Sequence, residues 1–369
     1  MQVEPNSGAL SRLEWDHLHF YVGNAKQAAH YYATAFGFTL IAYAGPETGM
    51  RDRASYVLEQ DRLRFVLTSP LGSDGEIADF VRIHGDGVHD VALRVPNAKA
   101  ALAAAAEGGA RVVAEPSELA DDDGTVGLAT IATYGDTVHT FVAREAYHGL
   151  FLPGYVAASS IARAPNRGRL SHIDHVVGNV GWNEMDRWCD YYARVFGFTQ
   201  LVSFDDKDIS TEFTALRSKV MSDAERRVKF PINEPAEGKK RSQIEEYLDF
   251  WKGAGVQHVA IATDDIIATV KNLRANGVAF LEAPPAYYDA LPSRIGPIAE
   301  AIAELKDLGI LVDRDDLGYM LQIFTKPLQD RPTLFFEIIQ RKGSLSFGRG
   351  NFKALFVAIE EEQGKRGTL

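Results

Sequence analysis

The stretch Ser171–Val180, SHIDHVVGNV, resembles a stretch near the start of the chain, Glu14–Ala25, EWDHLHFYVGNA. Each copy places an Asp-His pair in a run of apolar, β-branched and aromatic residues, which is typical of a buried strand. The similarity continues into AHYYATAFGFTL and CDYYARVFGFTQ, where a helical pattern ends at a glycine. The sequence therefore contains two copies of one strand–helix unit.

A second unit is repeated further along each half. DGVHDVALRV matches AGVQHVAIAT, and one offset of 168 residues relates Asp90 to His258 and Gly109 to Gly277. We expect an α+β fold in which duplicated βαβββ modules form two open β-barrels, followed by a C-terminal helix. The predicted division is an N-terminal domain at 1–150, a linker rich in Pro, Gly and Ser at 151–170, and a C-terminal domain at 171–369.

Composition narrows the range of partners. The chain has 369 residues, of which 46% are hydrophobic, and a formal net charge of −11, which disfavours nucleic acid and anionic membrane surfaces. It contains no apolar run long enough to cross a membrane. One cysteine, Cys189, and the absence of a signal-peptide pattern favour the cytoplasm. We expect a small-molecule ligand, and self-association into a homo-oligomer through the N-terminal half.

The C-terminal half contains three histidines, His172, His175 and His258. Strand alternation puts His172 and His175 on opposite faces, and His175 shares its face with the apolar Ile173 and Val177. His258 also has apolar neighbours on its own face, so we expect both His175 and His258 to point inward. Such a histidine can be a hydrogen-bonded core residue or a metal ligand.

The position of Glu337 favours the interpretation of His175 and His258 as metal ligands. Glu337 lies in the strand LFFEIIQ and shares a face with Phe335 and Ile339, where a carboxylate is costly unless it is paired or bound to metal. Two histidines and one carboxylate form a facial triad on Fe(II) with open coordination positions. The long separations along the chain exclude a finger-type zinc site. We therefore predict one Fe(II) per chain, bound by His175, His258 and Glu337.

The N-terminal half offers a poorer set at the matching positions. These are His17, Asp90 and, by aligning VHTFVAR on FFEIIQR, Thr140. Threonine cannot supply an anionic ligand, so we expect the first half to keep the barrel without a metal. His17 and Asp90 would form at most a weak site.

Three C-terminal stretches resemble the 4-hydroxyphenylpyruvate dioxygenase family of the vicinal oxygen chelate superfamily. They are FPINEPAEGKKRSQIEEYLDFW, GYMLQIFTKPLQDRPTLFFEIIQRKG and FGRGNFKALFVAIEEEQGKRGTL. The resemblance implies the same three iron ligands, no organic cofactor, and conversion of 4-hydroxyphenylpyruvate and O₂ to homogentisate and CO₂ in tyrosine catabolism. It also implies catalytic roles for Ser218, Asn233, Gln243, Gln322, Phe324 and Phe335, and substrate binding by Pro231, Phe347, Gly348 and Phe352.

Three finer predictions concern geometry. If TKPLQD forms a hairpin connection, Gln322 lies opposite Glu337, and Phe324 lies opposite Phe335. Gln257 precedes a predicted ligand and, by alternation, points to the other face, which favours a structural role. The C-terminal helix begins after Asn351, which is placed to cap it; a packed surface helix and a lid over the pocket both fit its apolar spacing.

Two other functions remain open. 4-Hydroxymandelate synthase uses the same substrate, metal and fold but hydroxylates the benzylic carbon. A metal-free member of the superfamily could instead sequester a ligand, although a binding module gains nothing from Glu337. The stretches FPINEP and FGRGNF resemble the ring-hydroxylating family more closely.

Overall fold

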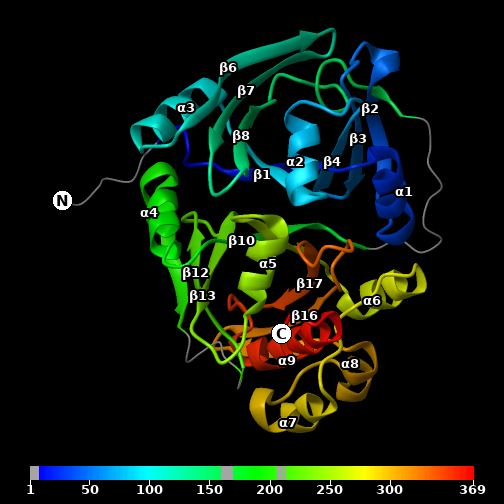
Figure 1. The fold of residues 1–369 in the computed structure, drawn as a ribbon, viewed down its shortest axis with the longest axis vertical. Helices are drawn as coiled ribbons and strands as arrows, with labels where there is room; N and C mark the ends of the chain where they lie inside the picture. The colour runs from blue at the N-terminus through cyan, green and yellow to red at the C-terminus, as the bar shows by residue number, and fades with distance from the viewer. Residues whose placement is uncertain (1–7, 159–168, 206–210, 212) are drawn as a thin grey trace.

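The structure is a computed structural model that describes residues 8–158, 169–205, 211 and 213–369. It consists of two β-sheets, one from each half of the chain, with helices around them (Figure 1). The N-terminal elements are β1 (Glu14–Tyr21), α1 (Ala25–Ala35), β2 (Thr39–Ala44), η1 (Pro46–Thr48), β3 (Arg53–Gln60), β4 (Leu63–Pro70), α2 (Glu76–His84), β5 (Gly87–Arg94), α3 (Ala98–Glu107), β6 (Val112–Asp121), β7 (Gly124–Ala132), β8 (Val138–Ala143) and β9 (Val156–Ala157).

The C-terminal half repeats this order and adds helices. Its elements are β10 (His172–Asn179), α4 (Met185–Phe196), β11 (Thr199–Phe204), β12 (Ala215–Ser222), β13 (Lys229–Ala236), α5 (Gln243–Trp251), β14 (Gly255–Ala262), α6 (Ile266–Ala275), α7 (Pro285–Ile295), α8 (Ile302–Leu308), β15 (Leu311–Asp315), β16 (Gly318–Phe324), β17 (Phe335–Lys342), η2 (Arg349–Asn351) and α9 (Phe352–Arg366).

The sheets confirm the predicted duplication. Their strand orders are β6-β7-β8-β5-β1-β4-β3-β2-β9 and β11-β12-β13-β10-β14-β17-β16-β15. In each sheet the first strands of the two modules, β1 with β5 and β10 with β14, pair antiparallel at the centre. The repeated residues therefore lie on neighbouring central strands.

Local sequence explains the repeated helices. Asn24 and Asp265 precede α1 and α6, and each side chain accepts a hydrogen bond from a backbone N–H of the first turn. After α4 the chain reverses at Gly197, whose φ of 70° is left-handed and suits glycine. These signals fix where α1 and α6 begin and where α4 ends.

The core between the two halves is continuous. Tyr32 of α1 packs against Phe336 of β17, and Nε2 of the buried His139 lies 2.9 Å from the hydroxyl of Tyr192 in the other half. Helix α4 lies beside α3 of the first half (Figure 1). One face of each sheet packs into this shared core. The other face of each sheet can therefore line a binding site.

The segment predicted as a linker contributes to the N-terminal sheet where it is described. Strand β9 pairs with β2, and Phe151 is buried against residues of the same sheet. The rest of that prediction, residues 159–168, lies outside the described residues.

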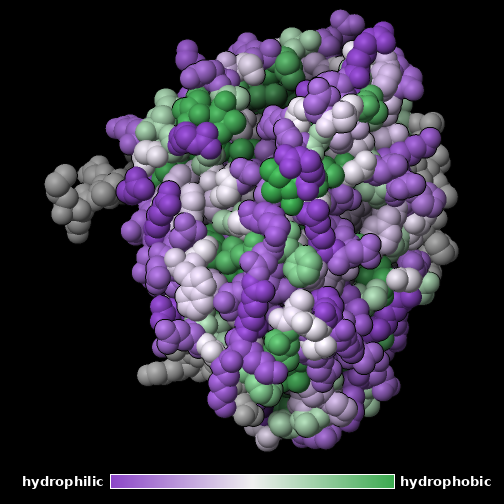
Figure 2. Space-filling view, viewed as in Figure 1, coloured by the Kyte–Doolittle hydropathy of each residue, from purple (hydrophilic) through white to green (hydrophobic). Residues whose placement is uncertain are grey.

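The surface carries apolar residues in separate small patches among hydrophilic side chains on the face seen in Figure 2. Among the described residues, no helix is both long and apolar enough to span a bilayer.

Candidate active site

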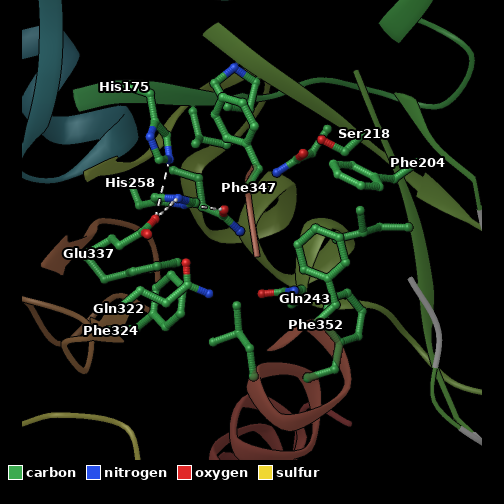
Figure 3. A pocket seen from close by; sticks show the side chains of 18 of the residues that line it. His175, Phe204, Ser218, Gln243, His258, Gln322, Phe324, Glu337, Phe347 and Phe352 are labelled. Carbon is green, nitrogen blue, oxygen red and sulfur yellow. Dashed lines mark hydrogen bonds and ion pairs between the residues drawn. The ribbon is translucent and has the colours of Figure 1, made fainter. Parts of the chain in front are cut away.

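One pocket of the C-terminal sheet collects nearly all of the predicted site residues. Its empty space is about 620 Å³, including the part open to solvent. Figure 3 shows its side chains converging from the sheet and from α9. The predicted residues that line it are His175, Ser218, Pro231, Asn233, Gln243, His258, Gln322, Phe324, Phe335, Glu337, Phe347 and Phe352.

The three predicted ligands meet at one wall of the pocket. Oε2 of Glu337 lies 3.3 Å from Nε2 of His175 and 3.6 Å from Nε2 of His258. The candidate ligand atoms all lie within 4.8 Å of one another. The side chains come from three adjacent strands, β10, β14 and β17, so the sheet itself fixes their spacing.

Neighbouring acceptors orient both imidazole rings. Nδ1 of His175 donates to Oδ1 of Asp174 over 2.7 Å, and Nδ1 of His258 donates to the side-chain oxygen of Gln257 over 2.9 Å. Each bond leaves Nε2 as the free nitrogen directed at Glu337. Three groups with lone pairs therefore converge, which fits a divalent cation. A metal-bound histidine usually donates its other ring N–H to an oxygen acceptor, as both rings do here.

Electrostatics at these groups favour positive charge beside Glu337. Burial alone would raise the pKa of Glu337, but the charge and hydrogen bonds of His175 and His258 lower it to about 2. Burial lowers the pKa of His175, yet Glu337 and Asp174 outweigh it and raise that pKa. Burial keeps the pKa of His258 below its usual value, because Glu337 offsets only part of the effect.

Asp174 was not predicted as a site residue. It is buried, and Arg341 binds it through Nε to Oδ2 at 2.8 Å and Nη2 to Oδ1 at 2.9 Å. Burial would raise the pKa of Asp174, but Arg341, His175 and Lys229 together hold it well below its usual value. The signal in the sequence was the Asp-His pair itself, which occurs in both halves.

A β-bulge corrects the predicted alternation around His175. Pairing between β10 and β14 shifts between Ile173 and His175, so Ile173 packs into the core between the halves while His175 and Val177 line the pocket. Alternation assumes a regular strand, and an extra residue in one strand breaks it.

A second bulge corrects the prediction for Gln257. In the same ladder Val177 pairs with His258 and Gly178 with Val256, so Gln257 is the extra residue. It lines the pocket beside His258 instead of pointing to the other face. Its hydrogen bond to His258 gives it a place in the site that alternation did not indicate.

The predicted hairpin register is wrong by two residues. Phe324 lies opposite Glu337, and Gln322 lies opposite Ile339. The contact extends past β16, since the backbone N–H of Thr325 donates to the carbonyl oxygen of Phe336 and the N–H of Phe336 donates to Oγ1 of Thr325. Because the shift is even, each side chain keeps its predicted face.

Aromatic side chains form the walls next to the ligands. The ring of Phe335 stacks on His258 with centroids 4.7 Å apart, and Phe324 meets His258 edge-on at 6.1 Å. Phe347 meets His175 edge-on at 5.2 Å. Opposite them, Phe204 and Phe352 pack edge to face at 4.9 Å.

Gly348 does not line the pocket, although it is adjacent to it. A Cβ added there would lie 2.5 Å from Nε2 of Gln322, and its φ of 76° is left-handed. Glycine at this position therefore allows the chain to pass directly against Gln322.

Asn351 precedes α9, but its side chain makes no cap hydrogen bond with the helix. It accepts a hydrogen bond from the hydroxyl of Tyr287 at 2.7 Å. The predicted cap is therefore wrong, since Asn351 instead ties the start of α9 to α7.

Seven lining residues were not predicted: Val177, Phe204, Leu216, Val220, Gln257, Leu355 and Phe356. Leu216 and Val220 flank Ser218 at strand spacing, which is a signal that the sequence does contain.

Family models match both halves. Residues 16–127 and 172–292 each match a model described as glyoxalase/bleomycin resistance protein/dioxygenase superfamily. Among solved structures, a variant of 4-hydroxymandelate synthase from Streptomyces coelicolor has a TM-score of 0.84 at 31% identity, covering 95% of this chain and 98% of that one.

Curated relatives extend the match over almost the whole chain. A 4-hydroxyphenylpyruvate dioxygenase from Yarrowia lipolytica is 50% identical, covering 96% of this chain and 93% of that protein. Dioxygenases of the same name from Xenopus tropicalis and Dictyostelium discoideum are 48% and 47% identical; they cover 97% and 96% of this chain, and 93% and 99% of their own lengths are matched. The chain therefore belongs to the 4-hydroxyphenylpyruvate dioxygenase family.

Proposed function

We propose that this chain is an Fe(II)-dependent dioxygenase that converts 4-hydroxyphenylpyruvate and O₂ to homogentisate and CO₂ in tyrosine catabolism. The observation that carries the proposal is the meeting of His175, His258 and Glu337 at the wall of an aromatic pocket. The chain's identity of about half to dioxygenases over nearly its full length supports it.

His175, His258 and Glu337 would hold one Fe(II). When bound, the metal supplies open coordination positions for an α-keto acid and O₂. Asp174 and Gln257 hold the two imidazole rings so that each presents Nε2. A buried carboxylate facing two imidazoles is costly without a cation, so these residues fit a catalytic centre better than a metal-free binding module.

The substrate ring would lie between aromatic walls. Phe324 and Phe335 sit beside His258 with their rings at 72° to each other, which offers both stacking and edge contacts to an aromatic ligand. Phe347 covers His175, and Phe204 and Phe352 lie on the opposite side beside α9; together they would limit the access of water to the reacting groups. α9 serves here as part of the pocket wall.

Polar side chains would orient the two ends of the substrate. Ser218 and Asn233 lie opposite each other on β12 and β13, and Gln243 starts α5. Gln322 reaches the pocket past the backbone of Gly348. A few placed hydroxyls and amides in an apolar pocket fix the orientation of a ligand, while Pro231 shapes the wall next to Asn233.

Benzylic hydroxylation to 4-hydroxymandelate is the second candidate, and the structural match to a 4-hydroxymandelate synthase favours it. That match is 31% identical, against about half for the dioxygenases. The test supplies metal-stripped protein with Fe(II), 4-hydroxyphenylpyruvate and O₂, and separates the products by chromatography with NMR, because the two acids are isomers. Homogentisate supports the proposal; 4-hydroxymandelate, or no Fe(II)-dependent O₂ uptake, contradicts it.

We also infer a cytoplasmic homo-oligomer. The single cysteine, Cys189, is buried and unpaired, which suits a reducing compartment. β6 forms one edge of the N-terminal sheet, and its residues from Val113 onward are exposed; such an edge can pair with another chain. Sedimentation equilibrium of the full chain tests this, and a monomer at all concentrations would contradict it.

A further inference from the structure

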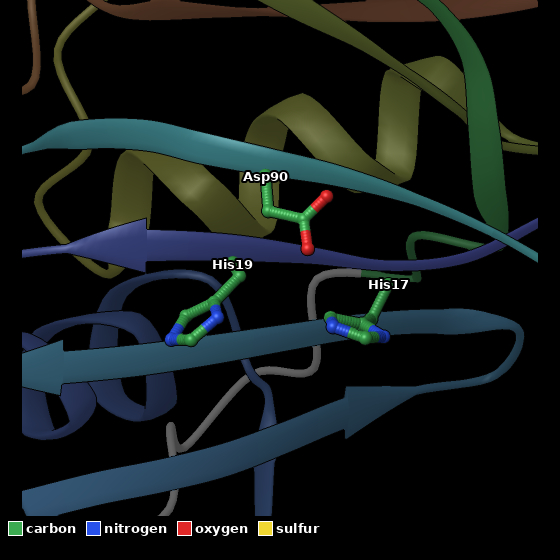
Figure 4. A group of neighbouring side chains, drawn as sticks. All are labelled: His17, His19 and Asp90. Carbon is green, nitrogen blue, oxygen red and sulfur yellow. The ribbon is translucent and has the colours of Figure 1, made fainter. Parts of the chain in front are cut away.

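Three possible metal ligands also meet inside the N-terminal sheet. They are His17 and His19 of β1 and Asp90 of β5, and their candidate ligand atoms lie within 4.8 Å of one another. Figure 4 shows the Asp90 carboxylate directed toward the space between the two imidazole rings. His17 and Asp90 are buried, and His19 is partly buried. The donor set matches that of the C-terminal triad in chemical type.

The strand register relates this cluster to the C-terminal site. Asp90 lies opposite His19 in the β1–β5 ladder, at the position where His258 lies opposite Val177 in the β10–β14 ladder. Both ladders shift directly after this pair and once before it. Asp90 therefore holds the position of a proposed ligand, and His19 adds a donor where the other half has valine.

His19 changes the expectation that the N-terminal half holds no metal. That expectation takes Thr140 as the counterpart of Glu337, and β8 does pair with β5 in the register that β17 keeps with β14. Thr140 supplies no anionic donor. The second imidazole comes instead from β1, two residues after His17.

The hydrogen bonds that orient the first histidine of each metal cluster are present in both halves. Nδ1 of His17 donates to Oδ1 of Asp16 over 2.7 Å, the same distance as from His175 to Asp174. Arg144 holds Asp16 through Nε to Oδ2 at 2.8 Å and Nη2 to Oδ1 at 2.7 Å, as an arginine holds Asp174. Because a carboxylate only accepts, Nε2 of His17 is left with its lone pair free for a cation.

His19 and Asp90 are also oriented so that each can bind a metal ion. Nε2 of His19 lies 2.6 Å from Oγ1 of Thr68, which can accept its proton and so leave Nδ1 with a free lone pair. The backbone N–H of Thr140 donates to Oδ1 of Asp90 at 2.9 Å. This bond fixes the carboxylate and uses only one of its two oxygens.

We propose that His17, His19 and Asp90 form a second site, for a divalent transition-metal ion, that links β1 to β5. The ion would act on the stability of the N-terminal sheet, since binding only to the folded chain adds to the free energy of unfolding.

Stoichiometry with Co(II) tests the proposal. The full chain without an affinity tag is stripped with chelator, dialysed against Co(II), and measured by elemental analysis and visible absorption. We expect two equivalents in the unmodified chain, one in Glu337→Gln, and none in Glu337→Gln combined with Asp90→Asn. The matched control combines Glu337→Gln with His30→Gln, an exposed histidine of α1, and retains one equivalent.

Asp16→Asn provides a second route that keeps all three ligands. It should weaken the second site by about 10- to 100-fold while the first remains unchanged. His19→Gln should abolish the second site, and circular dichroism confirms folding of each variant. One equivalent in the unmodified chain with none in Glu337→Gln overturns the proposal. So does a second equivalent that survives both His19→Gln and Asp90→Asn.

Discussion

Nδ1 of His175 donates a 2.7 Å hydrogen bond to Oδ1 of Asp174, and this bond determines which ring nitrogen faces Glu337. Asp174 is itself held by two hydrogen bonds from Arg341, with the ammonium group of Lys229 3.4 Å away. Two cations around one buried carboxylate keep it ionised, so that it can accept from His175. A single residue pair thus connects the sheet's ionic network to the proposed metal ligand.

Asp174→Asn should lower the Fe(II) affinity of the C-terminal site by about 10- to 100-fold, because the amide keeps the shape and loses the charge that fixes the imidazole. Activity should recover in part at saturating Fe(II), as expected for a positioning residue. Metal titration followed by O₂ uptake measures both. The matched control is Asp16→Asn, which changes the same motif in the other half; an equal loss of activity in both variants would contradict the assignment.

Glu337→Gln should abolish activity and lower Fe(II) affinity by more than about 100-fold, since losing a residue that only hydrogen-bonds to a metal ligand already lowers the affinity about 10- to 100-fold. The fold should persist, because the amide opens no cavity. Elemental analysis and thermal unfolding check the two parts. Glu360→Gln, another buried carboxylate that accepts from Thr214 at 2.6 Å, is the control for burial alone. Full activity in Glu337→Gln would refute the triad.

The pH dependence of stability should reveal His139 at the junction of the halves. Burial lowers the pKa of His139 to about 4, whereas in the unfolded chain a histidine titrates near 6.5. As pH falls from about 6.5 to 4 the unfolded chain gains a proton that folded His139 does not, so its contribution to stability is lost across this window.

His139→Gln should therefore flatten the pH dependence in that window by up to roughly 1 kcal/mol per pH unit. Urea unfolding at pH 7, 6 and 5 measures it, with His30→Gln as the exposed control. Parallel curves for His139→Gln and the unmodified chain would show that His139 does not titrate in this way.

Much of the fold was predictable because repetition and alternation are local patterns. The shared offset and the glycines after α1 and α4 indicate two copies of each module without reference to any contact. The site was partly predictable as well, because burying the carboxylate of Glu337 costs free energy unless it is paired or bound to metal. That cost predicts partners such as His175 and His258. Such arguments depend on residue type and spacing alone.

The bulges could not be predicted in that way. A bulge depends on how two strands pair, so the alternation in the HIDHV and VQHV stretches misplaced Ile173 and Gln257. The β16–β17 register likewise depends on Thr325, outside either strand. Leu355 and Phe356 line the pocket because α9 packs against the sheet. How a helix packs against a distant part of the chain is not visible in local sequence patterns.

The outcome of oxidation should depend on Phe335, whose ring stacks on His258 and stands at 72° to Phe324. These walls would hold the substrate ring so that the ring carbon bearing the side chain, and not the benzylic carbon, receives the oxygen. Phe335→Ala removes one wall but none of the groups proposed to hold the keto acid. Decarboxylation and O₂ uptake should therefore continue in part while homogentisate falls further, with some benzylic product. Parallel measurement of CO₂, O₂ and both acids tests this, and Leu345→Ala, at an exposed side chain away from the pocket, is the control. A strictly proportional loss of CO₂ and homogentisate would mean that Phe335 supports the reaction without directing it.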